Sequence, residues 1–462
     1  MMMHRIFGLV ALGAGLLAMP AVGGAQPKTE HRQQRVGLDE CVRMALRRNH
    51  EIERADATVD EAVAARRSIR GRFGPILQAE AGIQRWDAPS EMAMEVPISI
   101  PGMPPIPPIT LEVQDQTTKQ LSFTAIQPIT GLWGVYEGHR ALSYGEDAAR
   151  HGRRATRNDV IRAVADAYFQ ALGADKFAEI AEVSVRQIEA HVERARSFHR
   201  HDLIGDDKML EAEVRLAEGQ AMLIKAQGAV TLARSALAFR MGLPATEQAI
   251  PAPVDAKEAA LTKEAVNYEV AASQAVRARP ELAALGARVQ QADAGVNAAW
   301  AQMIPQVSLL ASAQYAKGIS FQRESQYFVG ALASWNFWEW GSTYYGIDQA
   351  RARARQAKAG QAQLREAVRL EVRQALVEQR IAKQQLEVMR RAAAQAAENL
   401  RLVERRFAVD ASTSTDVLDA VALQARAQAG EATAYYNYLR ARVALRRARG
   451  QRPVGNAPGG GR

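Results

Sequence analysis

Residues 368–407 read VRLEVRQALVEQRIAKQQLEVMRRAAAQAAENLRLVERRF, and apolar side chains recur there at alternating intervals of four and three residues. A seven-residue period of this length keeps one face of a helix turned toward a partner and predicts a left-handed coiled coil. The many alanines permit close approach of that partner, and Gln379 is the one polar residue of the seam. The seam consists of Val368, Val372, Ala375, Gln379, Ala382, Leu386, Met389, Ala393, Ala396, Leu400, Val403 and Phe407.

The same seam occurs a second time, 208 residues earlier in the chain. The two stretches predict helices over 140–200 and 347–408, each about 60 residues and so about 90 Å long. No compact globule accommodates helices of this length. A shorter returning helix is expected after each one, over 207–242 and 414–449. The earlier seam consists of Val160, Val164, Ala167, Ala171, Ala174, Ala178, Ala181, Val185, Ile188, Val192 and Ala195.

Short motifs outside the helices repeat as well. NHEI at 49–52 matches RPEL at 279–282, and a proline follows each motif at the same interval, at Pro75 and Pro305. Repetition of this kind predicts two copies of one structural unit. The first copy is expected over 38–243 and the second over 280–450, with a linker or equatorial segment at 244–279 and a disordered tail at 451–462.

Strict alternation of apolar and polar residues follows each proline, and this period of two predicts β-strands. After Pro75, for example, Leu77, Ala79, Ala81 and Ile83 alternate with polar residues or glycine. A second alternating segment closes the strand region of each copy. The four predicted strands lie at about 75–86, 119–128, 305–315 and 326–337.

The predicted strands have the length of membrane-crossing strands, because a tilted strand of about 10 residues spans a bilayer in a barrel. Aromatic residues lie near their ends, among them Trp86, Tyr315, Tyr327 and Trp335. Four strands cannot close a barrel alone, and open sheet edges are not tolerated in lipid. Several subunits must therefore share one barrel, and three chains would supply 12 strands.

A proline-dense stretch separates the first two predicted strands. Residues 90–113 read SEMAMEVPISIPGMPPIPPITLEV, and proline cannot donate to a sheet ladder. A long external loop is expected here, with a disordered linker as the alternative.

The N-terminus has the composition of an export signal. His4 and Arg5 precede an apolar run over residues 6–19, and small residues follow, so a signal peptide is predicted at 1–25. No later stretch approaches the roughly 20 uncharged apolar residues of a spanning helix. The only cysteine, Cys41, lies well past the cleavage point, so neither an intramolecular disulfide nor a lipid anchor on this residue is expected.

Charge and motif content argue against several classes of function. The net charge of +9 comes from arginines spread along helical faces, so no nucleic-acid partner is expected. The chain has none of the motifs GxxxxGK[ST], HExxH, GxSxG and CxxC, which argues against an enzyme and against a cofactor. His199 and His201, with Asp202 nearby, are metal-binding residue types, but their spacing favours a solvated turn over a metal site.

Several motifs together resemble the TolC family of outer-membrane efflux and secretion channels, over nearly the whole mature length. RRFAVDASTSTDVLDAVAL at 405–423, followed by AYYNYLRARVALRRARG at 434–450, is similar to the signature of that family's second repeat. NHEI, RPEL, QPITG and NFWEWG resemble its shorter landmarks.

The resemblance implies a homotrimer in the outer membrane of a Gram-negative bacterium. Its fold would be mixed α and β: a 12-stranded β-barrel, four strands per chain, continued by a long periplasmic α-helical coiled-coil barrel. Its function would be the exit duct of a tripartite efflux or type I secretion system. A periplasmic adaptor would open the duct for an inner-membrane transporter of the RND or ABC type.

The resemblance also implies a pore constriction at Asp416 and Asp419. Residues three apart share a helix face, so three chains would form two stacked carboxylate rings while Val417 and Leu418 pack sideways. Such rings attract cations. Helix capping is the alternative, since Ser414 or Thr415 can cap and an acidic residue suits the first turn.

Two turns at the periplasmic tip are the candidate adaptor contacts, and both differ from the family pattern. In the second copy, Val409 is followed by aspartate rather than glycine, and serine replaces the basic residue often found two positions later. In the first copy, the glycine is displaced from the position expected in the turn. Phe198 and Phe407 are expected to pack in the seams or to lock the tip. The candidate contact residues are Phe198, Ile204, Gly205, Phe407, Val409, Asp410, Ala411 and Ser412.

The alternative function is that of a structural or adhesive coiled-coil protein of the envelope without transport activity. Heptads alone would suit that function, but four paired strands per chain and a duplicated topology are not explained by it. If the protein is a channel, its sequence leaves open whether it exports drugs, metals or proteins.

Overall fold

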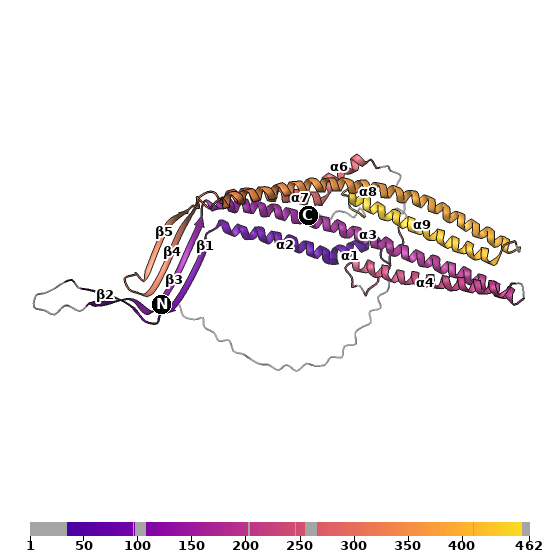
Figure 1. Cartoon of the computed structure of the whole chain (residues 1–462), viewed down its shortest axis with the longest axis horizontal. Coiled ribbons are helices and arrows are strands. Elements are labelled where there is room, and N and C mark those ends of the chain that lie inside the picture. The colour runs from indigo at the N-terminus through magenta and orange to yellow at the C-terminus, as the bar shows by residue number, and fades with distance from the viewer. Residues whose placement is uncertain are drawn as a thin grey trace, which may run out of the picture. The chain divides into compact units, whose positions relative to one another are not determined.

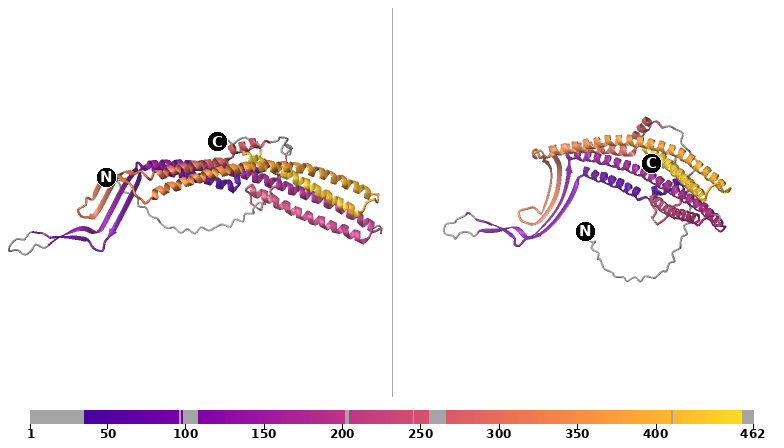
Figure 2. Two further views of the ribbon diagram at one scale, coloured as in Figure 1. Left: turned by 45° about the horizontal axis from the view of Figure 1, so that its top comes forward. Right: turned by 45° about the vertical axis from the view of Figure 1, so that its right-hand side comes forward.

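The computed structural model of the chain contains two long helical hairpins (Figure 1). The first pairs α3 (Gly131–His199) with α4 (Asp206–Arg240), and the second pairs α8 (Ser342–Phe407) with α9 (Ser414–Ala448). In each hairpin the two helices lie side by side in every view (Figures 1 and 2). The structure describes residues 35–95, 97, 108–201, 204–244, 246–254, 266–409 and 411–454, so the signal peptide predicted at 1–25 lies outside the described residues.

The two long helices begin earlier than the heptad pattern predicts. α3 begins at Gly131 rather than near residue 140, and α8 begins at Ser342 rather than near residue 347. The added turns of α3 include Gly134, although glycine weakens an isolated helix. Here it permits close packing beside α7 (Pro280–Trp300), because a Cβ at this position would lie 3.3 Å from the Cβ of Ala301. Tertiary packing therefore overrides helix propensity, whereas the other helix ends match their predicted positions within about two residues.

The heptad seams are buried, as their periodicity predicts. Val372 and Leu386 of α8 are fully buried. Buried residues of α3, α4, α8 and α9 join those of a short helix, α1 (Leu38–Arg48), in one hydrophobic cluster that includes Tyr168. Cys41 is also fully buried there, and burial raises the pKa of its thiol to about 12. The long hairpins and the N-terminal segment thus share one core.

Two pairs of short helices accompany the hairpins. α1 and α2 (His50–Arg70) have 11 and 21 residues, and α6 (Tyr268–Ala278) and α7 have the same two lengths. The segment predicted at 244–279 as a linker or equatorial segment therefore ends in a helix. A capping asparagine starts this helix, because the side chain of Asn267 accepts a hydrogen bond from the backbone N–H of Glu269.

The C-terminal segment is also more ordered than its composition predicts. Val454 is buried in the main hydrophobic cluster, beside Leu38 and Val443. The disorder predicted from residue 451 was therefore wrong as far as Val454, since Pro453 and Val454 are both buried and hold this stretch against the core. Residues 455–462 lie outside the described part of the chain.

One antiparallel sheet joins the two halves of the chain. Its order is β1 (Ile76–Arg85), β3 (Ile109–Pro128), β4 (Gln306–Ile319) and β5 (Ser325–Ser334). These are the four predicted strands, but β3 starts near residue 109 rather than 119 because it pairs with a fifth strand, β2 (Ser90–Met94). The loop predicted over 90–113 was thus wrong at both ends, where no proline interrupts the ladder. Residues 98–107 lie outside the described residues.

None of the described helices combines the length and the apolar character that crossing a membrane requires.

A substitution at Gly242, just after α4, tests how tightly the short helices pack on the hairpins. Its φ is 79°, and a Cβ there would lie 2.6 Å from the carbonyl carbon and oxygen of Arg48. We expect Gly242→Ala to lower the free energy of unfolding by more than about 1 kcal/mol. Gly228→Ala is the matched control, because no atom lies within 4 Å of the added Cβ inside α4. Thermal unfolding of the purified protein measures both, and equal midpoints would contradict the packing described.

Candidate functional site

The register of the sheet gathers the alternating apolar residues on one face. Leu77 pairs with Ala125, Phe123 with Ala313, and Ala313 in turn with Tyr327. The side chains of this face are exposed within one chain, Leu77 by 77% and Tyr327 by 81%. Four strands therefore present one continuous apolar surface.

The opposite face of the sheet is mostly polar across its central strands. Gln78 pairs with Thr124, which pairs with Ser312, and the hydroxyls of Thr124 and Ser312 lie 3.3 Å apart. Glu80 likewise pairs with Ser122. A sheet with one apolar and one polar face suits a wall between lipid and water, as in transmembrane barrels.

The sheet has two open edges. In the described residues β1 pairs only with β3, and β5 pairs only with β4. Unpaired backbone N–H and C=O groups cost several kcal/mol each in hydrocarbon, so neither edge can face lipid. In lipid, each of these edges therefore needs a partner strand.

The start of α9 holds Asp416 in a capping box. Thr413 is the N-cap: its hydroxyl accepts a hydrogen bond from the Asp416 N–H at 3.2 Å, and its own N–H donates to Oδ2 of Asp416 at 2.8 Å. The hydroxyls of Thr413 and Ser412 donate to the same oxygen. These hydrogen bonds, with that of the Thr413 backbone foremost, hold the pKa of Asp416 below its usual value. The cap predicted at Ser414 or Thr415 therefore lies at Thr413 instead.

Asp419 has a different environment. Its side chain is 63% exposed, and its Oδ1 lies 3.5 Å from Nη2 of Arg215 on α4. Val417 and Leu418 between the two aspartates are buried, as predicted, and Leu418 lies in a cluster with Ile188 and other residues of the hairpins. Asp416 and Asp419 thus both lie on the exposed side of α9.

A second polar contact joins the same two helices. The hydroxyl of Thr415 donates to Oε2 of Glu211 on α4 at 3.2 Å. Glu211 also accepts a hydrogen bond from Lys208, which lowers the pKa of its carboxyl more than any other neighbour does. Two side-chain contacts at the start of α9 therefore connect this helix to α4 of the other hairpin.

His191 is a tip residue that sequence reasoning missed. It is 1% exposed, its Nε2 lies 2.5 Å from the hydroxyl of Ser414, and its ring centre lies 5.2 Å from that of Phe407. Its Nδ1 is buried without a hydrogen-bond partner. The only sequence signal was its position next to Val192, a seam residue. Burial, with a smaller effect of the Arg194 charge, lowers the pKa of His191 to about 4.

The aromatic residues of the tip pack on the seams. The rings of Phe198 and Phe407 lie 6.2 Å apart, at the adjoining ends of α3 and α8. Phe407 also contacts His191, so its ring connects two of the long helices. The contact joins the two hairpins at the tip, while Phe198 stays 36% exposed.

The tip turns place their remaining candidates at the surface. Val409 is 73% exposed, and Ala411 is also exposed. Ser412 is partly buried, whereas Asp410 lies outside the described residues. In the first turn Ile204 is partly buried and Gly205 is the N-cap of α4.

The histidines of the first turn make local contacts. Nε2 of His199 lies 2.6 Å from Oδ1 of Asp206, and Nδ1 of His201 lies 2.7 Å from the carbonyl oxygen of Ser197. No group of three or more metal-ligand side chains occurs in the described part of the chain. Asp202 lies outside that part.

An amphipathic sheet with two open edges, continued by long coiled-coil hairpins, defines the subunit of a membrane channel. The profile of the outer membrane efflux protein family matches residues 41–243 and 271–451, and the chain belongs to this family. The resemblance to the TolC family is thereby confirmed, and with it the function of an outer-membrane efflux channel. The family consists of channel proteins rather than enzymes.

Solved outer-membrane proteins have the same fold. CmeC of Campylobacter jejuni is 16% identical, with 89% of this chain and 85% of that chain covered and a TM-score of 0.76. VceC of Vibrio cholerae is 17% identical, with coverages of 90% and 96% and a TM-score of 0.71. MtrE of Neisseria gonorrhoeae is 20% identical, with coverages of 90% and 89% and a TM-score of 0.71. No curated protein matches the chain by sequence.

Buried His191 should make the tip sensitive to acid. Its pKa is 6.5 in an unfolded chain and about 4 here, so the unfolded state binds more protons between these values. The neutral ring's contribution to the free energy of unfolding is therefore fully present above pH 6.5, and it decreases by about 3 kcal/mol as the pH drops toward 4. His191→Gln should remove this loss, measured as hydrogen exchange at the tip against pH.

His50→Gln is the control, because the His50 side chain is 90% exposed. An unchanged pH dependence in His191→Gln would show that other groups cause the acid sensitivity.

Proposed function

We propose that three copies of this chain form the exit duct of a tripartite efflux or type I secretion system, with 12 strands closing one outer-membrane barrel. The observation that carries this proposal is the sheet, which combines an apolar face with two edges that need partner strands. Membership of the outer membrane efflux protein family supports it. In this arrangement the apolar face meets lipid, the polar face lines the duct, and the hairpins extend into the periplasm.

The chain is a duplicated unit in this proposal. α1 and α2 correspond to α6 and α7, β1 and β3 to β4 and β5, and the hairpin α3–α4 to α8–α9. The equal lengths of the short helices support this correspondence. The second unit then begins at α6, earlier than the boundary at residue 280 that the motif comparison predicts.

The duct is closed at the tip by α9 and opened when an adaptor binds. Asp416 and Asp419 form two carboxylate rings around the axis, and like charges at a narrow point favour cations. The Asp416 capping box is compatible with this role, because only Oδ2 takes part in its hydrogen bonds. The Oδ1 atom of Asp416 and the exposed Asp419 carboxylate supply the ring charge.

The tip turns receive the periplasmic adaptor, which links the duct to an inner-membrane transporter of the RND or ABC type. The exposed side chains of Val409 and Ala411 in one turn, and Gly205 in the other, are available for such contacts. Opening requires the hairpins to separate. The Asp419–Arg215 and Thr415–Glu211 contacts between α9 and α4 must then break.

A structural coiled-coil protein without transport activity is the competing function. It would account for the heptads but gives the amphipathic sheet no role. An envelope spacer would need neither an apolar face on four strands nor two edges that require partner chains.

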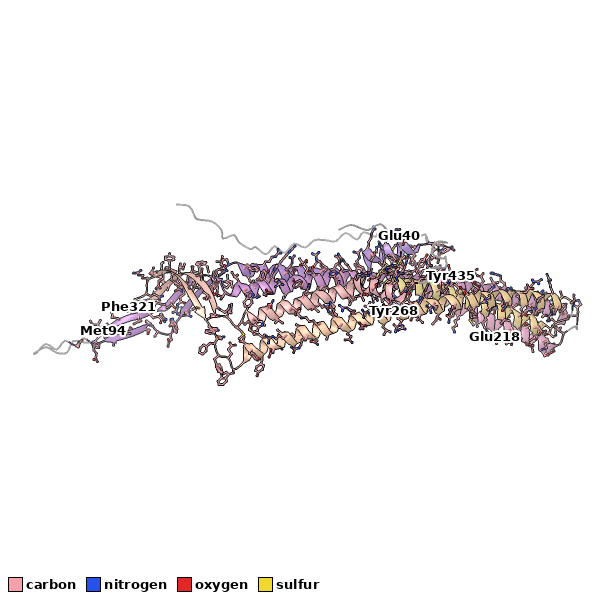
Figure 3. The ribbon with its side chains drawn as sticks, turned by 90° about the horizontal axis from the view of Figure 1, so that it is seen from above. Glu40, Met94, Glu218, Tyr268, Phe321 and Tyr435 are labelled. Atoms are coloured by element: carbon pink, nitrogen blue, oxygen red, sulfur yellow. The ribbon has the colours of Figure 1, made fainter. Side chains whose placement is uncertain are left out.

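Single-channel current distinguishes these functions. Purified wild-type protein in a planar bilayer should show a small conductance that favours cations, because the tip is closed and carries the aspartates. Asp416→Asn/Asp419→Asn should reduce or abolish the cation preference, while asparagine preserves side-chain size and capping ability. Glu40→Gln is the control, since this exposed acidic residue lies on α1, away from the tip (Figure 3).

Unchanged ion preference in the double variant would limit the two aspartates to helix capping. Absence of current from a folded wild-type oligomer would instead favour the structural function.

A further inference from the structure

His191 lies where the two long hairpins meet at the tip. It belongs to α3 of the first hairpin, near the end of that helix at His199. Its ring contacts the second hairpin at two points, the Phe407 ring at the end of α8 and the hydroxyl of Ser414 at the start of α9. These helix ends lie together in Figure 1. One side chain of α3 thus touches both helices that must move away from it when the tip opens.

The buried ring is not a requirement of the repeated architecture. His191 is 1% exposed. The residue 208 positions later in the other copy is Asn399, which is exposed on α8. Histidine is the side chain whose ordinary pKa lies closest to neutral pH. A titratable ring is therefore placed in the junction between the hairpins by one copy only.

The hydrogen bonds of His191 fit only the neutral ring. A neutral imidazole has one donor nitrogen and one acceptor nitrogen, whereas the charged form has two donors. Nε2 can bond to the Ser414 hydroxyl in either neutral tautomer, because a hydroxyl donates or accepts. Nδ1 is buried and has no hydrogen-bond partner in the described residues. A second proton would therefore leave a buried positive charge with an N–H that lacks an acceptor, and this is costly.

The carboxylates of the surrounding helices do not compensate such a charge while the tip is closed. Asp416 on α9 is held by Thr413 and Ser412, and Glu211 on α4 contacts Lys208 and Thr415. Asp419 lies beside Arg215. The other charged side chains at these ends of α3 and α8 are exposed, namely Glu189, Glu193, Arg194, Arg196, Glu404, Arg405 and Arg406.

Both influences on the ring oppose protonation. Burial has the larger effect and the positive charge of Arg194 the smaller one, and together they lower the pKa of His191 to about 4. Each depends on the closed arrangement, since α8 and α9 supply the Phe407 and Ser414 contacts. Separation of the hairpins removes both contacts and admits water to Nδ1.

We propose that His191 is a proton-operated release of the tip, so that acid in the periplasm opens the duct without an adaptor. This inference rests on the proposed function, and it adds a second trigger for the same motion. The ring takes up a proton only when α8 and α9 have moved away from α3, and the protonated ring then prevents their return. Once solvated, the imidazolium is hydrated and no longer lacks an acceptor for its second N–H.

The size of the effect follows from the protons bound in each state. A solvated histidine has a pKa of 6.5 and the buried ring one of about 4, so the open state binds more protons between these values. Lowering the pH from 7.5 to 5 should shift the equilibrium of one chain toward the open state about 30-fold. Where three chains open together, these factors multiply. Asp416 keeps its charge at pH 5, because its hydrogen bonds hold its pKa below the usual value.

Planar-bilayer recording at two pH values tests the proposal. Purified full-length protein is added from one chamber, so that the tips remain on that side, and this chamber is held at pH 7.5 or 5.0. Wild type should spend roughly ten times as long or more in a large-conductance state at pH 5.0. His191→Gln should abolish this rise, because glutamine still offers Ser414 a polar partner but gains no charge. His50→Gln is the control, since the His50 side chain is 90% exposed, and it should respond as wild type does.

A tip that cannot separate should not respond to acid. Thr415→Cys/Glu211→Cys places two thiols at the contact between α9 and α4, where a short bismaleimide can join them. The joined protein should stay in its small-conductance state at both pH values, while the untreated double variant should still open at pH 5.0. Wild type treated with the same reagent is the control, because its Cys41 is buried. If His191→Gln does not assemble, His191→Asn replaces it.

The failures are distinguishable. An equal rise in wild type and His191→Gln, or no rise in a wild type that conducts, overturns the inference and leaves the proposed function intact. Acid opening of the joined protein overturns it as well, since the response would then not require the hairpins to separate. If no variant carries current at either pH from a folded oligomer, the proposed function itself fails.

Discussion

The structure depends on one constraint: a strand edge cannot remain unpaired in lipid. Each chain provides four long strands that carry most of their apolar residues on one face, and in the described residues the outer strands β1 and β5 each have one unpaired edge. Closing the sheet with identical chains satisfies both edges at once, because the β5 edge of one chain can pair with the β1 edge of the next. The hairpins that follow the strands are then brought together around one axis, and the aspartates at the start of α9 can form rings.

The helical part combines buried apolar seams with exposed polar contacts between the hairpins. Within each hairpin the helices are held by continuous apolar seams, in which residues such as Val372 and Leu386 are fully buried. Between α9 and α4 near the tip, the polar contacts are Asp419–Arg215 and Thr415–Glu211. Exposed ion pairs contribute little, typically below about 1 kcal/mol. The two hairpins also share buried apolar contacts near the tip, where Ile188 of α3 and Leu418 of α9 lie in one hydrophobic cluster, so separation at the tip must break these contacts as well.

The features predicted well from sequence are those with a long period. The heptads predict both long hairpins, and the alternation of apolar and polar residues predicts four strands and the faces on which their residues lie. α6 and β2 were missed because short elements carry little periodicity, and both depend on local contacts: an asparagine cap for α6 and pairing with β3 for β2. The sequence also indicated that Val417 and Leu418 are buried between two exposed aspartates.

Residues whose role comes from tertiary surroundings were not predictable. His191 looks like a solvated helical residue until α8 and α9 bury it beside Phe407 and Ser414. Gly134 disfavours a helix until α7 is packed against it. Val454 lies in a segment of disordered composition that is held by its own burial and that of Pro453. In each case neighbours distant in sequence supply the energy that local propensity lacks.

Disulfide trapping between β1 and β5 tests the central claim most directly. Glu80→Cys on β1 is combined in turn with Phe328→Cys, Gly330→Cys or Leu332→Cys on β5, in a background where the buried Cys41 is replaced by alanine. Closure of one barrel by three chains predicts that at least one register yields covalent dimers and trimers in membranes, and no larger species. Folded, membrane-inserted protein that forms no crosslink at any register, or that forms ladders beyond three chains, would contradict it.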